Sequence, residues 1–530
     1  MRRILPLLLC FLLLTGASTQ KVQHFDNNSG GLNTRAGTLT VADNEATVAE
    51  NFNFTTTGSI VKRKGNTEFV GGTPTRMQSG TVSLLGDYQL IDGTQKIVGA
   101  SGDKVYKTDS TSDGDWDDIT SGETVTAGNI FDWSQYRNIF VFTNGVDKVF
   151  GWDQTSSASD IKQLTIPTNL TAAFFTEIFS EFHFLGNVIV SATSHRSRIY
   201  YSNVGKVETW TATDFVDIGR DKAEGQITMM KTLGDRLVIG KQTGAIYNTF
   251  FTGDADLPFI IQRSFSQVGC GAMRSAVVVN NILFFWSTDG IGFYAYDGIN
   301  SVEISEKIQP TLEGFASSRY ADIIGEVFPE LNQIWWSMTS TGSTHDRIVV
   351  FDYVSNAWSI HTGIDAAYLQ LLEKGSELKM FSGNYGGRVI EQNISTADVN
   401  ASGTDDTAIV ATYKTKWFDL SNPALVKSLN HAIIYTQIES TEHSFNVGWG
   451  YDFDESDFGT LTVDVGGGGT TWGDENWGAF NWATSTGGRV KRLDLTGRGR
   501  FCRLAFSNSQ ASQPFTVDGF SLIYKEESLF

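Results

Sequence analysis

A unit of two short strands joined by a tight turn recurs along this chain and constrains its fold more than any other feature. Residues 281–298, NILFFWSTDGIGFYAYDG, show the unit most clearly. An apolar run at 282–286 meets a Thr-Asp-Gly turn, and a second aromatic run follows at 291–296. Two β-branched and aromatic runs separated by a polar, glycine-containing break are typical of a β-hairpin.

Seven such hairpin units occur between residues 85 and 395. Their first strands begin at residues 97, 139, 188, 237, 282, 334 and 378, so successive starts are 42, 49, 49, 45, 52 and 44 residues apart. Several units add a strand marked by Trp, at residues 115–120, 209–211 and 356–360. Four short strands every 40–50 residues is the period of a β-propeller blade.

The repeat predicts an all-β protein with a β-propeller of six to eight blades at residues 76–396. One four-stranded blade cannot cover both of its faces, whereas a ring of blades lets each cover the next. Residues 55–70 are expected to lend a strand to the last blade, and residues 305–312 to form a short helical turn. The alternative is a large β-sandwich whose regular spacing is coincidental.

Composition supports a folded all-β chain. The 530 residues include 54 Gly, only eight Pro and 12% aromatic residues, which is too apolar for disorder. The net charge of −19 argues against tight binding of nucleic acid, which requires clustered Lys and Arg. It remains compatible with a surface past which DNA slides without adhering.

Residues 1–20 have the form of a secretory signal. Arg2 and Arg3 precede an apolar run at 4–14 and a small-residue site at 15–17, and the run is short for a membrane span. This run contains Cys10, so the body of the chain has only Cys270 and Cys502. At most one disulfide, Cys270–Cys502, is possible in the body, but two isolated cysteines are more often buried and unpaired, and this is what we expect.

Two further regions flank the propeller. Residues 21–75 are expected to form an N-terminal arm that includes the basic run Lys62-Arg63-Lys64. Residues 397–530 alternate apolar and polar positions, which predicts a C-terminal antiparallel β-sandwich domain. Within it, Trp472, Trp477 and Trp482 follow a glycine run at a spacing that fits neither a helix face nor a strand face. We interpret them either as a partner contact or as residues packed back on the sandwich.

No motif for catalysis is present. The chain lacks a nucleophile elbow, a phosphate-binding loop and an HExxH zinc motif, and its seven His are scattered. Asp113, Asp115 and Asp117 have the spacing that begins a calcium loop, but Asp118 stands where the loop needs glycine. The sequence therefore predicts no enzymatic activity and no cofactor or metal.

Several motifs resemble a family of bacteriophage proteins, the tail nozzle or DNA-stabilisation proteins of short-tailed phages. They are GGLNTR at 30–35, DNEA at 43–46, AENFN at 49–53 and GSIVKRKG at 58–65. The C-terminal FCRLAFSN at 501–508 and PFTVDGFSL at 514–522 also look like the ends of such proteins. The resemblance covers the arm well and the rest of the chain more generally.

The resemblance implies a structural virion protein, commonly six copies in a ring below the portal and adaptor, through which DNA leaves. Its partners would be tail adaptor or portal-side proteins, tip or fibre proteins and the host envelope, with DNA only as transient cargo. Asn33, Arg35, Lys62, Arg63 and Lys64 of the arm are the expected partner contacts, together with the three Trp. The alternative, favoured by residues 1–20, is a secreted or periplasmic propeller that binds glycan or protein.

Overall fold

The computed structural model describes residues 20–70, 76–109, 114–154, 160–220, 222–400, 403–439, 443–465 and 490–527. The chain folds into two compact units. One comprises Lys64–Ile409, and the other combines Met1–Arg63 with Val410–Phe530. The first unit is therefore inserted, in sequence, into the second.

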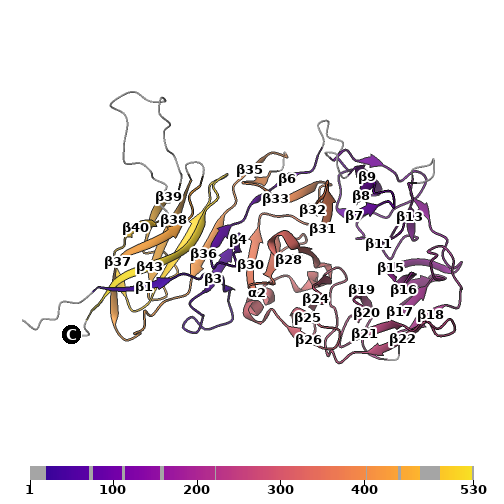
Figure 1. The fold of residues 1–530 in the computed structure, drawn as a ribbon, viewed down its shortest axis with the longest axis horizontal. Coiled ribbons are helices and arrows are strands. Elements are labelled where there is room, and N and C mark those ends of the chain that lie inside the picture. The colour runs from indigo at the N-terminus through magenta and orange to yellow at the C-terminus, as the bar shows by residue number, and fades with distance from the viewer. Residues whose placement is uncertain are drawn as a thin grey trace, which may run out of the picture. The chain divides into compact units, whose positions relative to one another are not determined.

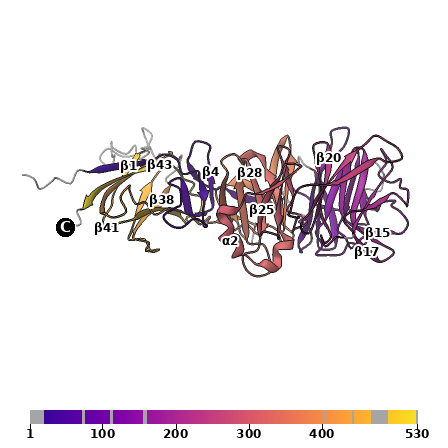
Figure 2. The ribbon, with the colours of Figure 1, turned by 90° about the horizontal axis from the view of Figure 1, so that it is seen from below.

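The inserted unit is a β-propeller. Figure 1 looks onto its ring, in which antiparallel four-stranded blades follow one another in chain order. Six blades are separate four-stranded sheets, and the meander β27–β30 is a seventh. This number lies within the predicted range of six to eight, and the all-β prediction is confirmed. Figure 2 shows the blades from the edge of the ring.

The first three blades occupy residues 82–217. Their strands are β7 (Val82–Gln89), β8 (Gln95–Ser101), β9 (Lys104–Asp109) and β10 (Asp117–Asp118); β11 (Asp132–Tyr136), β12 (Ile139–Thr143), β13 (Phe150–Trp152) and β14 (Lys162–Gln163); and β15 (Leu170–Phe179), β16 (Phe182–Val190), β17 (Thr193–Tyr201) and β18 (Phe215–Asp217).

The remaining blades occupy residues 227–395 and one earlier strand. They are β19 (Ile227–Leu233), β20 (Arg236–Lys241), β21 (Ile246–Phe251) and β22 (Phe259–Arg263); β23 (Val277–Val279), β24 (Ile282–Ser287), β25 (Gly292–Tyr296) and β26 (Ser301–Glu303); β27 (Ile324–Phe328), β28 (Gln333–Met338), β29 (Arg347–Asp352) and β30 (Ala357–Thr362); and β31 (Tyr368–Lys374), β32 (Glu377–Gly383), β33 (Val389–Ser395) and β6 (Gly65–Glu68).

The recurring hairpin of the sequence is the central strand pair of each blade. In the fifth blade β24 pairs with β25, with Trp286 opposite Phe293. Both faces of these central strands are covered by neighbouring blades, so they carry the longest apolar runs. Phe293 stacks on Trp336 of the next blade at a ring-centroid distance of 4.1 Å. The outer strands are shorter and more exposed, which explains why the sequence identified them less clearly.

The ring closes with a strand from the beginning of the unit. Strand β6 pairs antiparallel with β33, and Glu68 lies opposite Ile390. This confirms the prediction that residues 55–70 lend a strand to the last blade. Hydrogen bonds also join successive blades: the Phe131 amide donates to the Ser83 oxygen (2.9 Å), and the Val82 amide donates to the Asn384 oxygen (2.9 Å) across the closure.

Helix is scarce in the part of the chain that the structure describes. The turns η1 (Glu306–Ile308) and α2 (Gln309–Glu313) confirm the predicted helical turn, and η2 (Ser317–Asp322) and η3 (Pro329–Leu331) lie nearby. A small hairpin, β34 (Asp398–Val399) and β35 (Asp405–Thr407), ends the unit. Among the described residues, no helix combines the length and apolar character required to cross a membrane.

The second unit is built from two antiparallel sheets. One contains β4 (Phe52–Phe54), β5 (Ile60–Lys62), β43 (Thr516–Glu527), β37 (Val426–Thr436) and β40 (Val490–Asp494), with β1 (Lys21–Phe25) and β41 (Arg498–Gly499) at its sides. The other contains β3 (Glu45–Glu50), β36 (Ala411–Thr415), β42 (Cys502–Asn508), β38 (Ser444–Tyr451) and β39 (Gly459–Asp464), and β2 (Gly31–Leu32) pairs parallel to β3.

Aromatic side chains from the two sheets meet in the core of this unit. Phe506 of β42 lies 5.9 Å from Phe520 of β43, and Phe52 of β4 lies 5.8 Å from Tyr413 of β36, between ring centroids. The arrangement matches the predicted antiparallel β-sandwich. Cys502 is buried here and Cys270 is buried in the propeller, both as free thiols, as expected.

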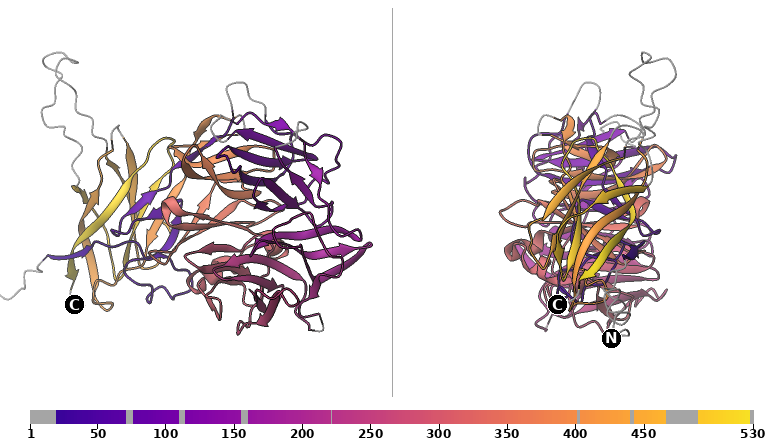
Figure 3. Two further views of the ribbon diagram at one scale, coloured as in Figure 1. Left: turned by 45° about the vertical axis from the view of Figure 1, so that its right-hand side comes forward. Right: turned by 90° about the vertical axis from the view of Figure 1, so that its left-hand side faces the viewer.

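The N-terminal arm is not a separate segment. Strand β1 pairs with β43 and β3 pairs with β36, so residues 20–63 complete the sandwich. In Figures 1 and 3 these indigo strands lie among the orange and yellow C-terminal strands. The predicted boundaries at residues 75 and 397 therefore shift to Arg63 and Val410. The composition along the chain could not predict these boundaries, because the sheets of the sandwich join segments that are distant in sequence.

Candidate functional site

The side chain of Arg274 crosses the axis of the propeller. Its backbone oxygen accepts a hydrogen bond from the Gly325 amide (2.9 Å) in the sixth blade. Its guanidinium donates to the backbone oxygens of Ile130 (3.2 Å) and Phe174 (3.3 Å), at the start of the second and third blades. In a ring of seven these blades lie opposite the sixth. Arg274 therefore forms a floor across the centre of the ring.

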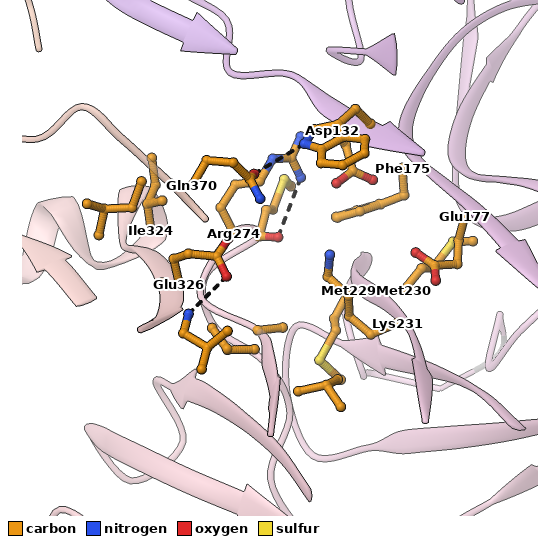
Figure 4. A pocket seen from close by; sticks show the side chains of 18 of the residues that line it. Asp132, Phe175, Glu177, Met229, Met230, Lys231, Arg274, Ile324, Glu326 and Gln370 are labelled. Carbon is orange, nitrogen blue, oxygen red and sulfur yellow. Dashed lines mark hydrogen bonds between the residues drawn. The ribbon is translucent and has the colours of Figure 1, made fainter. Parts of the chain in front are cut away.

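A cavity of about 340 Å³ lies on one side of this floor, lined by the innermost strands of the blades. Five charged side chains line it, and each comes from a different blade (Figure 4): Asp132, Glu177, Lys231, Arg274 and Glu326. A second cavity, of about 350 Å³, lies on the other side of the floor and shares Met273, Arg274 and Ile324 with the first.

The five charged groups make no ion pair shorter than 4.0 Å, with one another or with any other described residue. Their hydrogen bonds are to backbone and hydroxyl groups. Asp132 accepts from the Thr176 amide (2.9 Å), and Glu326 accepts from the Val327 amide (2.9 Å). Glu177 accepts from the Thr232 hydroxyl (2.8 Å).

Burial disfavours the ionised form of two carboxyl groups in this cavity, Glu326 and Glu177. It raises the pKa of Glu326 to about 7, although the Val327 amide and the charge of Lys231 act in the opposite direction. It also raises the pKa of Glu177, against the charge of Lys231 and the hydrogen bond from Thr232. The Lys231 ammonium is therefore near enough to both carboxylates to act on them, but is bonded to neither.

Within the described residues no group of three or more His, Cys, Asp and Glu is placed to hold a metal ion. Of the acidic residues considered for calcium, Asp113 lies outside the described residues, and Asp117 pairs with Lys107 at 3.1 Å. The cavity is a partly enclosed space lined by charged side chains that form no ion pairs.

Asn33 and Arg35, predicted as partner contacts, lie in an exposed turn of the sandwich unit. The Asn33 amide donates to the Glu45 carboxylate (2.7 Å), and its side-chain oxygen accepts from the Arg35 and Ala36 amides (3.2 and 2.9 Å). Asn33 thereby shapes the turn, and Arg35 and Lys64 are exposed. Their partner role remains a prediction.

Lys62 is a different case, because it is buried at 2% exposure. Its ammonium donates to the Asn508 side-chain oxygen (2.7 Å) and to the backbone oxygens of Gln510 (3.2 Å) and Gln513 (3.3 Å). All three ammonium hydrogens are thus used within the sandwich unit. Lys62 therefore joins β5 to the loop before β43.

Arg63 is also buried, and it bonds to Asn51. Its Nε donates to the Asn51 side-chain oxygen (2.7 Å), while the Asn51 amide donates to the Val410 backbone oxygen (2.7 Å). Arg63 and Val410 are the residues at which the chain leaves and re-enters the sandwich unit. Asn51 thus clamps both ends of the insertion, so the motif residues 51, 62 and 63 have structural roles.

Trp472, Trp477 and Trp482 lie outside the described residues. Conversely, sequence reasoning missed all five charged residues of the axial cavity. Four of them lie on or beside the first strand of a blade, whereas the repeat revealed the second and third strands. A charged residue interrupting an apolar innermost strand, such as Glu177 in LTAAFFTEIF, was the available signal.

Neither a protein-family model nor a curated protein matches the chain. Solved structures are similar in part. The structure of U3-55K is 8% identical, covering 63% of this chain and 100% of its own, with a TM-score of 0.42. BBS1N, in complex with ARL6DN, is 12% identical and covers 64% and 99%, with a TM-score of 0.40. The designed protein Ika8 is 13% identical and covers 62% and 100%, with a TM-score of 0.37.

Proposed function

We propose that this chain is a non-enzymatic structural protein of a short-tailed phage tail, several copies of which form the wall of a channel that retains and then releases DNA. The proposal starts from the resemblance of residues 30–65 to tail nozzle proteins. A wall protein requires a rigid scaffold and no catalytic centre, and the closed propeller provides such a scaffold.

The distribution of charge carries the proposal. Lys64–Ile409 contains 41 Asp and Glu against 24 Lys and Arg, a net charge of −17. The other unit contains 18 against 16, a net charge of −2. The acidity of the protein is therefore concentrated in the propeller. Phosphate repulsion would keep duplex DNA from adhering to such a wall.

The axis of the propeller is too narrow to serve as the proposed DNA channel. Arg274 crosses the centre of the propeller, and the cavity on one side holds only about 340 Å³. A duplex cannot thread such a space. A DNA channel formed by this protein would therefore lie between copies arranged in a ring, with propellers as parts of its wall. A closed ring of identical subunits requires a head-to-tail interface.

The test is the mass of the native assembly together with the N-terminal sequence of its subunits. A ring of about six full-length copies of the 58.2 kDa chain is expected. A monomer that begins near residue 18 would contradict the proposal.

The second candidate is a secreted or periplasmic propeller that binds glycan or protein. The axial cavity favours a binding role, because binding sites of proteins are concave and contain a few convergent polar groups. The signal-like residues 1–20 favour secretion. The same measurement separates the two functions, since a trimmed monomer would support this one.

A further inference from the structure

We infer that the axial cavity is a binding site for a small organic cation, a guanidinium or alkylammonium group, held by Glu326 and Glu177. This inference goes beyond the structural role proposed above and does not depend on it. The same cation chemistry could come from a free small molecule or from an Arg or Lys side chain of a partner protein.

The balance of charge in the cavity favours a cation. Asp132, Glu177 and Glu326 line the cavity, and Lys231 is the cation that faces them. Arg274 contributes its charge from the floor, where its guanidinium donates to backbone oxygens. The cavity therefore contains three carboxylates but only two cationic side chains, and one of these, Arg274, already donates to backbone oxygens.

Both carboxylates are held in place by hydrogen bonds, but neither is paired with a cation. Glu326 comes from the sixth blade and Glu177 from the third, so they approach the axis from opposite sides, and Figure 4 shows Lys231 pointing into the space between them. Neither carboxylate lies within 4.0 Å of a cationic group among the described residues. An added cation would form the ion pair that both carboxylates lack, in addition to the hydrogen bonds that they accept from the Val327 amide and the Thr232 hydroxyl.

The walls of the cavity suit an organic cation better than a hydrated metal ion. Phe175, Trp133 and Tyr368 contribute aromatic rings, and Met229, Met230 and Met273 contribute thioethers. Aromatic faces attract guanidinium and ammonium groups, and Arg274 already lies over the Phe175 ring at 5.2 Å. Flexible thioethers adapt to the shape of a guest. The volume is at the lower end for ligand sites, which suits a single side chain or a molecule of similar size.

Protonation should compete with the guest. Burial raises the pKa of Glu326 to about 7, so near neutral pH this group is partly protonated. The other titratable or charged groups that face the cavity are Asp132, Glu177, Lys231, Arg274 and Tyr368. A cation binds the ionised carboxylate, so its affinity should rise about tenfold between pH 6 and pH 8.

The experiment is calorimetric titration of the full-length protein with methylguanidinium at pH 8 and constant ionic strength. Wild-type protein should bind saturably. Glu326→Gln should bind about tenfold more weakly, because it loses one charge-assisted hydrogen bond. Lys231→Met should bind more tightly, since it removes the charge that repels the guest. Glu330→Gln, an exposed change at η3, is the matched control and should match wild type.

The opposite effects of the two cavity variants are the decisive result, because a general loss of folding would weaken both. A second titration uses the blocked peptide Gly-Gly-Arg-Gly-Gly. If the peptide also binds saturably, and Glu326→Gln weakens it, the source is a partner side chain; if only methylguanidinium binds, the source is a small molecule. The inference is overturned if neither probe binds, or if Glu326→Gln and Lys231→Met both bind as wild type does.

Discussion

The guanidinium of Arg274 donates a hydrogen bond to the backbone oxygen of Phe174 at 3.3 Å, across the centre of the propeller from the strand that holds the Arg274 backbone. One side chain thereby connects blades that share no sheet. It lies between two cavities along the axis and lines both of them.

Replacing this arginine should loosen the whole ring. Arg274→Met keeps most of the side-chain volume but loses the bonds to Ile130 and Phe174. We expect the free energy of unfolding of the propeller to fall by about 2–4 kcal/mol, measured by urea denaturation. Arg137→Met, at a side chain that is 64% exposed, should change it by less than about 0.5 kcal/mol. Equal effects of the two variants would show that the axial bonds do not stabilise the ring.

The closing strand β6 depends on Glu68, whose side chain is 2% exposed. Its carboxylate accepts two hydrogen bonds from Arg76, at 2.5 and 2.8 Å, and lies 3.6 Å from Arg388. Glu68→Gln removes the buried negative charge that faces both arginines, which should destabilise the closure by about 2–4 kcal/mol. Hydrogen exchange of the amides in β6 and β33 should accelerate, while Glu377→Gln, at an exposed pair, should leave it unchanged.

Asn51 combines two roles that different substitutions can separate. It adopts a left-handed conformation (φ 60°) and bonds to both Arg63 and Val410. Asn51→Gly keeps the conformation but loses the side-chain bonds, so the sandwich should lose about 2 kcal/mol. Asn51→Ala should lose about 1 kcal/mol more, because alanine disfavours this conformation. Asn332→Gly, at an exposed turn with φ 56°, serves as the control and should leave thermal stability nearly unchanged.

Substitution of Lys62 tests whether the basic run Lys62-Arg63-Lys64 stabilises its own chain or contacts a partner. Lys62→Met removes the ammonium donor from the oxygens of Asn508, Gln510 and Gln513, of which Asn508 keeps the Gln510 amide, so the sandwich should lose about 2–4 kcal/mol of unfolding free energy. The mass of the native assembly should stay the same. Lys525→Met, an exposed change on β43, should alter neither property. A smaller assembly with unchanged stability would instead make Lys62 a partner contact.

The raised pKa of Glu326 predicts a pH-dependent stability. Its pKa in the folded protein is about 7 against an ordinary value of 4.5, so the folded state binds the proton more strongly. The stabilising contribution of the neutral carboxyl is full below pH 4.5 and is lost as pH rises through 7. The difference in unfolding free energy between Glu326→Gln and wild type should grow by up to about 3 kcal/mol from pH 4.5 to pH 8, in favour of the variant. A difference that is constant with pH would contradict this.

The sequence by itself determined the fold class and the repeat. The central strands of each blade are covered on both faces, so each appears in the sequence as a short apolar run next to a turn. These runs recur about every 45 residues. The sandwich strands alternate apolar and polar residues because one face of each sheet packs in the core, and this pattern is also visible in short stretches of sequence. The two buried free cysteines were also predicted correctly. The closing strand was predictable because a propeller with an open last blade leaves a strand edge unpaired.

Only the tertiary structure decided which distant segments join and which charges converge. The arm belongs to the sandwich because β1 pairs with β43, a contact across some 500 residues that no local pattern encodes. Lys62 and Arg63 look like surface charges in the sequence, and only their partners Asn508 and Asn51 reveal them as buried. The axial cavity exists because ring closure brings one charged residue from each of five blades to a common axis. These five residues come together only in the closed ring, so the sequence of a single blade cannot predict the cavity.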